Sequence, residues 1–331
     1  MSQQNLTFFR YPPSWLTDSF LAGIGVIFAA GAITIWGLKK LIFTRAVGNR
    51  SWYDLSGKVV CVTGATGGLG KALSSVLIAR GAKVIVTGRN AKALAELIDE
   101  LKHVPEHQLH NPTVYNPVGV ELDLGNLDSI PAKAREILSR YGRVDVLIHN
   151  AGLSSRGAVM ETGIELDKQL MTVNYLAPVA LTKELLPPMV ETGDAYVVAI
   201  GSVQGKMTLP FRSPYAASKH ALHAFCECLR AEVQHQGVSV LVVSPGYIRT
   251  GLSLNALTGD GARYGKMDET IATGMEPLAV AEETIRSIEH RRMDVLICGF
   301  LPTLGIYMRT LWPSLYFLTM RRRAEKALKK A

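Results

Sequence analysis

The stretch T-G-A-T-G-G-L-G, Thr63 to Gly70, follows a short β-branched run and precedes a helical pattern. Glycines here let the backbone turn tightly and approach a pyrophosphate, whose charge lies at the N-terminus of the following helix. The stretch fits two spacings: T-G-x-x-x-G-x-G uses Gly64, Gly68 and Gly70, whereas G-x-x-G-x-x-G uses Gly67 in place of Gly68. Both are nucleotide-binding turns, so the stretch predicts a nucleotide site and leaves the enzyme class open.

Apolar runs alternate with helical patterns from residue 57 onward. The runs read K-V-V-C-V-T-G, A-K-V-I-V-T-G, V-G-V-E-L-D-L, V-D-V-L-I-H-N, A-Y-V-V-A-I-G, V-S-V-L-V-V-S-P-G and M-D-V-L-I-C-G. Such near-continuous apolar runs are typical of a parallel sheet whose two faces are both covered by helices. We therefore predict an α/β fold with a doubly wound, seven-stranded parallel sheet, the Rossmann fold, with ligands at the carboxyl ends of the strands.

The positive charge of the chain gathers beside apolar segments. The net charge is +8, and the hydrophobic content of 48% is high for a purely soluble enzyme. Basic clusters that adjoin apolar segments favour a membrane surface over nucleic acid as the partner. The clusters are Lys39, Lys40, Arg45 and Arg50, and Arg321, Arg322, Arg323, Lys326, Lys329 and Lys330. The four cysteines make no disulfide framework, and we expect no metal site.

Residues 19–38 carry no charge and form the predicted membrane anchor. Twenty such residues span roughly 30 Å as a helix, the thickness of the hydrocarbon layer. Basic residues follow this segment, whereas in a signal peptide they precede the apolar core. We expect an N-terminal tail (1–18), a transmembrane helix (19–38) and a basic linker (39–54); a buried core helix is the alternative.

The side of the membrane on which the large domain lies follows from the same charges. The Lys/Arg excess after the segment places the domain in the cytosol, with the lumen as the alternative. The sequons that begin at Asn5 and Asn49 lie on opposite sides of the span and do not decide the question.

Residues 300–331 are apolar and then basic. Arg309 and the prolines at positions 302 and 313 argue against a second span. Aromatic residues followed by three arginines favour a segment that associates with the membrane interface. Packing against a partner subunit is the competing interpretation. The catalytic domain then covers residues 55–299.

The end of the second predicted strand bears on the choice of nucleotide. It reads V-T-G-R-N, with Gly88 and Arg89 and no acidic residue before Glu96. An acidic side chain here would accept hydrogen bonds from the 2′-hydroxyl of NAD. A guanidinium instead matches a 2′-phosphate in charge and geometry. Arg89 therefore favours NADP(H) over NAD(H), and a solvated arginine at a helix start is the alternative.

Residues suited to proton transfer follow the fourth and fifth strands. Asn-Ala-Gly occupies positions 150–152, and Tyr215 comes 13 residues after Ser202, with Lys219 four further on. Residues four apart on a helix share a face, so the ammonium can lie beside the phenol and lower its pKa from the usual value near 10. Tyr215 would then exchange a proton with a carbonyl that Ser202 holds, while nicotinamide supplies the hydride. Alone, Tyr-x-x-x-Lys is also a common exposed helix pair.

Together these motifs resemble the short-chain dehydrogenase/reductase family, in its compact one-domain branch, over about residues 55 to 300. The resemblance rests on T-G-A-T-G-G-L-G, N-A-G, the serine, Y-A-A-S-K and P-G-Y-I-R-T. It implies a catalytic tetrad of Asn174, Ser202, Tyr215 and Lys219. It also implies a cofactor-binding set of Gly64, Thr66, Gly68, Leu69, Gly70, Arg89, Asp123, Asn150, Ala151, Gly152, Tyr215, Lys219, Pro245, Gly246, Ile248 and Thr250.

The resemblance also implies a role for several of these residues. Asn174 would hold a water in a proton relay, and Lys219 would also bind the nicotinamide ribose. Asp123 would contact adenine, Asn150 would hold the central strand and the adenosine ribose, and Ile248 and Thr250 would contact the carboxamide. His149 stands where the family usually has asparagine. We expect only a local change beside the adenosine from it.

Within the family, the anchor together with V-T-G-R resembles the 11β-hydroxysteroid-dehydrogenase-like membrane reductases. This implies NADP(H), an apolar lipid, steroid or retinoid-like substrate, and the endoplasmic reticulum membrane, with the peroxisomal membrane as an alternative. Family habit implies a homodimer through the helices that carry Asn174 and Tyr215. Two other functions compete: an idle nucleotide-binding scaffold, against which the complete tetrad argues, and a sugar-nucleotide epimerase, which needs a larger C-terminal domain.

Overall fold

The computed structural model describes residues 52–103, 111, 113–252, 254–266 and 273–329. The predicted tail, the predicted transmembrane helix and most of the basic linker lie outside the described residues. Among the described residues, no helix combines the length and the apolar character that crossing a bilayer requires.

A seven-stranded sheet forms the centre of the described chain, in the order β3-β2-β1-β4-β6-β7-β9. Every neighbouring pair is parallel. The strands are β1 (Val59–Val62), β2 (Lys83–Gly88), β3 (Val118–Glu121), β4 (Val146–His149), β6 (Ala195–Ile200), β7 (Val238–Pro245) and β9 (Asp294–Ile297). Each apolar run of the sequence supplies one strand, so the predicted doubly wound parallel sheet is confirmed. The order reverses between β1 and β4, where ligands bind in folds of this kind.

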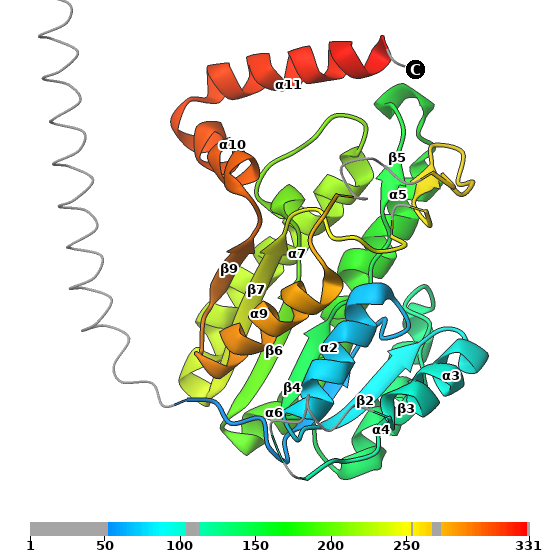
Figure 1. Cartoon of the computed structure of the whole chain (residues 1–331), viewed down its shortest axis with the longest axis vertical. Coiled ribbons are helices and arrows are strands. Elements are labelled where there is room, and N and C mark those ends of the chain that lie inside the picture. Colours follow the sequence, from blue (N-terminus) through cyan, green and yellow to red (C-terminus); the bar gives the residue numbers. More distant parts are fainter. Residues whose placement is uncertain (1–51, 104–110, 112, 253, 267–272, 330–331) are drawn as a thin grey trace, which may run out of the picture. The chain divides into compact units, whose positions relative to one another are not determined.

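Helices cover both faces of this sheet (Figure 1). One face packs against α2 (Gly68–Ala79), α3 (Ala91–Leu101) and α9 (Pro277–Glu289). The other face packs against α4 (Ile130–Tyr141), α6 (Ala177–Thr192) and α7 (Ser213–Val233). Two covered faces explain why the strands are apolar throughout rather than alternating.

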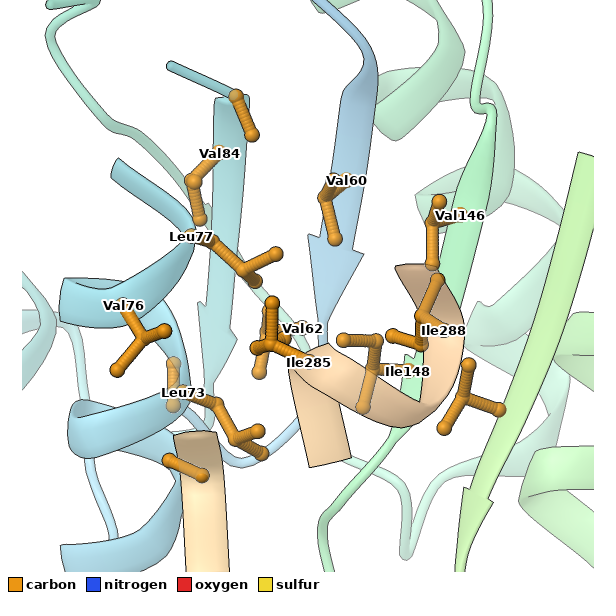
Figure 2. Close-up of a cluster of buried hydrophobic side chains, with 14 of the residues drawn as sticks. Val60, Val62, Leu73, Val76, Leu77, Val84, Val146, Ile148, Ile285 and Ile288 are labelled. Carbon is orange, nitrogen blue, oxygen red and sulfur yellow. The ribbon is translucent and has the colours of Figure 1, made fainter. Parts of the chain in front are cut away.

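Strand β1 shows how the two faces share the core. Val60 and Val62 point to the face of α2 and α9, and Val59 and Cys61 point to the opposite face. Figure 2 shows the first of these layers, with the two valines facing side chains of both helices; these are Leu73 and Leu77 of α2 and Ile285 and Ile288 of α9. Each fully buried side chain of this size contributes about 1.5–3 kcal/mol to stability.

Smaller elements surround the carboxyl edge of the sheet. Strands β5 (Ser155–Arg156) and β8 (Leu257–Thr258) form a separate parallel pair. Helix α5 (Ile164–Met171) continues through one π-helical turn, Thr172–Leu176, into α6. Single 3-10 turns occupy Leu127–Ser129, Val159–Glu161, Val203–Gly205 and Gln234–Gln236. Two-residue strands are too short to leave an alternating pattern, so the sequence did not predict this pair.

The C-terminal segment forms two helices, α10 (Phe300–Leu311) and α11 (Pro313–Leu328), with Trp312 between them. Both prolines lie in the first turn of a helix, where a proline costs no hydrogen bond. Most of the large apolar side chains here are exposed to solvent, whereas Tyr316 is fully buried. The exposed ones are Phe300, Leu301, Leu304, Tyr307, Leu311, Trp312, Leu315, Phe317, Leu318 and Leu328.

Candidate active site

The glycine turn between β1 and α2 packs directly against the end of β4. Gly64 has a φ of +62°, and a Cβ on it would lie 2.7 Å from the Cα of Ala151. A Cβ on Gly70 would collide with the carbonyl oxygen of Gly64. At Gly68 it would lie 3.2 Å from the Thr250 side chain, whereas at Gly67 it would meet an ordinary contact of 3.4 Å. Packing therefore constrains positions 64, 68 and 70 more than position 67.

The first turn of α2 is suited to an anion. Its N-cap residue, Gly67, has no side chain that accepts a hydrogen bond, and the turn contains no acidic residue. The free N–H groups and the positive end of the helix dipole attract negative charge. The turn therefore fits the pyrophosphate of a dinucleotide. The side chain of Leu69 is buried in the core, so only its backbone can face such a ligand.

Asn150 fastens the end of β4 to the glycine turn. Its backbone N–H donates to the Thr63 hydroxyl at 3.0 Å, and Nδ2 donates to the carbonyl oxygens of Thr63 at 2.9 Å and Gly64 at 3.1 Å. The N–H of Ala151 also donates to the Thr63 hydroxyl, at 3.2 Å. The Thr63 hydroxyl, at the start of the glycine turn, therefore has a structural role that the sequence did not predict.

Arg89 follows β2 at the same edge. A Cβ on the preceding Gly88 would lie 3.2 Å from the Thr66 side chain, which places the end of β2 against the glycine turn. Arg89 is exposed, and no ion pair or hydrogen bond joins it to another residue of the described part of the chain. Asp123, after β3, accepts a hydrogen bond from Gly125 N at 2.9 Å and closes a local turn.

The segment after β7 returns to the glycine turn. Strand β7 ends at Pro245, and the N–H of Gly246 donates to Ile297 O at 2.9 Å. Ile248 forms a bridge with Met275, and the Thr250 side chain lies against the Gly68 position. The structure thus gathers the predicted cofactor-binding residues at the carboxyl edge of the sheet.

Ser202, Tyr215 and Lys219 are buried together where β6 meets α7; each is at most 7% exposed. Lys219 Nζ lies 6.0 Å from the centre of the Tyr215 ring and donates to the carbonyl oxygen of Ile200 at 2.9 Å. The Ser202 hydroxyl accepts a hydrogen bond from Gln204 N at 3.1 Å and lies close enough to the Tyr215 phenol to lower its pKa. Burial excludes the alternative in which the tyrosine and lysine are an exposed helix pair.

Asn174 lies in the π-helical turn, an irregularity that is frequent at functional sites. Its Oδ1 accepts from Leu153 N at 2.7 Å, and its Nδ2 donates to Leu153 O and to the Ser218 hydroxyl, both at 2.9 Å. Ser218 in turn donates to Tyr215 O at 2.8 Å. Ser218, within Y-A-A-S-K, thus links two members of the tetrad, which the motif spacing alone did not predict.

Gly152 lies beside both Asn174 and Lys219. A Cβ on this glycine would lie 3.2 Å from Asn174 Oδ1 and 3.5 Å from Lys219 Nζ. Gly152 therefore brings the amide oxygen of Asn174 and the ammonium of Lys219 near one point of the backbone.

The ionisation of the tetrad differs from the sequence prediction. Burial raises the pKa of the Tyr215 phenol, against the lowering effects of the Ser202 hydrogen bond and the charges of Arg212 and Arg156. Burial also lowers the pKa of Lys219 to about 8. The predicted lowering of the phenol pKa is wrong for this arrangement, because desolvation outweighs the groups that favour the phenolate, and the Lys219 ammonium donates to the Ile200 carbonyl. The sequence contained no signal for either arginine.

His149 also differs from expectation. Its Nε2 lies 2.7 Å from the Thr182 hydroxyl of α6, and burial lowers its pKa to about 3. The ring is therefore neutral and joins β4 to the helix layer. The sequence predicted that His149 would change the structure beside the adenosine, whereas its side chain contacts Thr182 of α6.

Comparison with known proteins agrees with this geometry. The family model described as short chain dehydrogenase matches residues 58–259. A curated relative, dehydrogenase/reductase SDR family member 7B of Danio rerio, is 45% identical over 305 residues, which cover 92% of this chain and 96% of the relative. The C-terminal sequence L-P-T-L-G-I-Y-M-R-T-L-W-P-S-L-Y-F resembles this same subgroup, so the resemblance is confirmed over most of the chain.

Solved structures share the fold. A short chain dehydrogenase/reductase from Burkholderia phymatum in complex with NAD has a TM-score of 0.68 and 23% identity, covering 80% of this chain and 96% of that chain. A short chain dehydrogenase from Burkholderia cenocepacia in complex with NADP has a TM-score of 0.65 and 24% identity, covering 81% and 99%. Because both sequence identities are below 25%, the likeness to these two structures shows a shared fold.

The buried Lys219 predicts a pH-dependent stability. The unfolded chain holds the lysine proton up to about pH 10.5, whereas the folded protein releases it near 8. Between these values the unfolded state binds more protons, so the free energy of unfolding gains a contribution that rises with pH. Lys219→Met removes this pH-dependent contribution.

Measured by urea unfolding, the free energy of unfolding of Lys219→Met minus that of wild type should fall by about 2 kcal/mol between pH 7 and pH 9.5.

Lys92→Met is the control, because the Lys92 side chain is 88% exposed. Its stability relative to wild type should not change with pH. If Lys219→Met and wild type show the same pH dependence, the lysine is not desolvated as described.

Proposed function

The chain belongs to the short-chain dehydrogenase/reductase family of oxidoreductases, and we propose that it transfers a hydride between NADP(H) and a carbonyl or secondary alcohol of an apolar substrate while anchored to a membrane. The observation that carries this proposal is the connected, buried set of Asn174, Ser202, Tyr215 and Lys219 at the carboxyl edge of the sheet. A retained tetrad also argues against the idle scaffold.

Ser202 and Tyr215 are the groups that act on the substrate oxygen. Both hydroxyls lie in the same buried site, and a carbonyl oxygen that enters between them would receive two donors. Because burial raises the pKa of Tyr215, the phenol keeps its proton at neutral pH and serves as the general acid for reduction. The bound nicotinamide supplies the hydride to the carbonyl carbon in that direction, or accepts it in the other.

Lys219 and Asn174 restore the proton that Tyr215 gives up. The Lys219 ammonium carries its charge below about pH 8 and stabilises the phenolate once it forms. Asn174 Oδ1 and Lys219 Nζ both lie beside Gly152, and we expect a water held by Asn174 to pass a proton toward the phenolate. Asn174 is held by Leu153 and Ser218, which fixes its amide group beside Gly152.

The residues present fit a dinucleotide. The uncapped first turn of α2 suits the pyrophosphate, and the exposed guanidinium of Arg89 suits a 2′-phosphate. Gly67 lies where some NADP enzymes of the family carry a basic residue, so Arg89 would hold this phosphate largely alone. Structural relatives include both NAD and NADP complexes, so the preference for NADP(H) rests on Arg89.

Membrane association is supported by the two ends of the chain. Residues 19–38 are uncharged and long enough to span, and the exposed apolar side chains of α10 and α11 precede the Arg321–Arg323 cluster. We place the protein in the endoplasmic reticulum membrane with the catalytic domain in the cytosol, and a peroxisomal membrane or a lumenal domain are the alternatives. A homodimer through the helices of Asn174 and Tyr215 belongs to the same proposal.

Tyr215→Phe removes the proposed general acid and keeps the ring. We expect kcat/KM for the reduction of ketones by NADPH to fall about 10²–10⁴-fold, because the carbonyl oxygen has no proton donor. The Kd of NADPH should stay within a few-fold. Steady-state kinetics over a panel of apolar ketones, together with fluorescence titration of NADPH, provide the measurement.

Tyr141→Phe is the control for this test, since Tyr141 ends α4, before the start of β4 and away from the carboxyl edge. Its rates should equal those of wild type. Undiminished reduction by Tyr215→Phe would show that another group gives the proton.

Arg89→Asp tests the cofactor choice. An aspartate repels a 2′-phosphate and accepts from a 2′-hydroxyl, so the NADPH affinity should fall about 10–100-fold and the NADH affinity should rise. Titration of both cofactors gives the ratio. Arg135→Asp, on the exposed side of α4, makes the same charge change as a control. A preference for NADPH that survives Arg89→Asp would overturn the assignment.

Alkaline extraction and protease treatment of sealed microsomes test the anchor and its orientation. The full chain should stay in the membrane pellet at high pH, and added protease should digest the catalytic domain without detergent. Release into the supernatant would contradict the anchor. Digestion that requires detergent would place the domain in the lumen.

A further inference from the structure

We propose that the C-terminal helices hold the loop that follows Ser202, and that Arg309 and Tyr316 are positioning residues for this serine. The inference rests on the proposed function, because it concerns the same carbonyl-binding hydroxyl. The loop is residues 203–209, named here the serine loop. Its 3-10 turn, Val203–Gly205, begins directly at Ser202.

Arg309 of α10 ties the serine loop to the catalytic helix. Its Nη1 donates to Lys206 O at 2.7 Å and also contacts His220 Nε2 at 3.0 Å. His220 Nδ1 lies 2.8 Å from Ala216 O. Because a carbonyl oxygen only accepts, Nδ1 carries the proton and Nε2 accepts from Arg309. One guanidinium nitrogen thus joins the serine loop to α7, next to Lys219.

Tyr316 of α11 forms two hydrogen bonds with the backbone of Thr208. The phenol oxygen accepts from Thr208 N at 2.9 Å and donates to Thr208 O at 2.8 Å. Tyr316 is fully buried against Met207 and Leu209. Because the phenol both accepts from and donates to the backbone of Thr208, it favours one conformation of this part of the loop.

Met207 lies between these two anchors and meets α10 as well. A Cβ on Gly305 would lie 3.1 Å from Met207 Sδ, so the helix approaches the loop closely at a glycine. Three consecutive residues of the serine loop, Lys206, Met207 and Thr208, therefore each contact a C-terminal helix.

The opposite side of the serine loop rests on α7. His223, one turn after Lys219, forms a hydrogen bond with Ser244 of β7 at 3.2 Å. Its Nε2 would lie 2.8 Å from a Cβ on Gly201 and on Gly205, so the ring fills the space beneath the loop. The loop is thus enclosed between α7 and the C-terminal helices.

The enclosure reaches Ser202 through short backbone hydrogen bonds. Gly205 N donates to Ser202 O at 2.8 Å, and Lys206 N and Met207 N both donate to Val203 O. A shift of Lys206 therefore moves the turn that positions the serine hydroxyl. Because a misplacement of about 1 Å can cost about 10²-fold in rate, loosening the enclosure should lower kcat.

The test uses the full chain in detergent, with Arg309→Met and Tyr316→Phe as the variants. We expect kcat to fall about 10–100-fold in each, with the NADPH Kd unchanged within twofold, since the serine loop does not belong to the cofactor-binding set. Arg321→Met and Tyr307→Phe are matched controls, because both side chains are exposed on the same helices. Both controls should retain the wild-type kcat.

A double-mutant cycle with Ser202→Ala separates positioning from general loss of structure. If Arg309 acts through Ser202, adding Arg309→Met to Ser202→Ala should lower kcat by less than twofold further. A full additional loss in that background would overturn the proposal. Tyr316→Phe keeps the aromatic packing, so it carries the test if Arg309→Met does not fold.

Hydrogen exchange provides a readout that does not depend on turnover. The amides of Lys206, Met207 and Thr208 should exchange at least tenfold faster in Arg309→Met and Tyr316→Phe than in wild type and the controls. Unchanged exchange in both variants would overturn the proposal even if the enzyme is active. A wild-type protein that reduces no carbonyl would instead contradict the proposed function. The exchange rates would still show whether the C-terminal helices hold the serine loop.

Discussion

The contact between the glycine turn and the end of β4 is the constraint on which the site depends. Gly64 and Ala151 approach so closely that no side chain fits between them, and Asn150 bonds to the carbonyl oxygens of Thr63 and Gly64. This contact fixes the first turn of α2, where a pyrophosphate would bind, relative to Gly152, which lies beside Asn174 and Lys219. The anion site and the proton-transfer groups are thus parts of one rigid edge.

Burial of the catalytic groups follows from the same arrangement and has a cost in stability. Lys219 is charged at neutral pH in a desolvated position, with one hydrogen bond to the Ile200 carbonyl. The fold supports this position through the polar chain that runs from Asn174 through Ser218 to the backbone of Tyr215. Such a chain holds donors and acceptors in place before a substrate arrives, which is what catalysis by proton transfer needs.

The sequence predicted what local patterns encode and missed what distant contacts create. The strands could be recognised because each is apolar on both faces, and Tyr215 and Lys219 could be paired because a four-residue spacing is local. The direction of the Tyr215 pKa depends on burial by elements far along the chain, so the motif suggested the wrong one. Arg309 was interpreted as an obstacle to a second span, whereas it bonds to Lys206 and His220, 103 and 89 residues away.

We propose that NADPH gives a hydride to a carbonyl of an apolar molecule and that the tetrad supplies the proton. The most direct measurement incubates purified protein and a membrane lipid extract with NADPH deuterated at the transferable position, followed by mass spectrometry of all lipids. Wild type should yield alcohols that carry one deuterium on the carbinol carbon, and Tyr215→Phe should yield almost none. The same deuterated products from both proteins, or no deuterated product from wild type with bound NADPH, would contradict the claim.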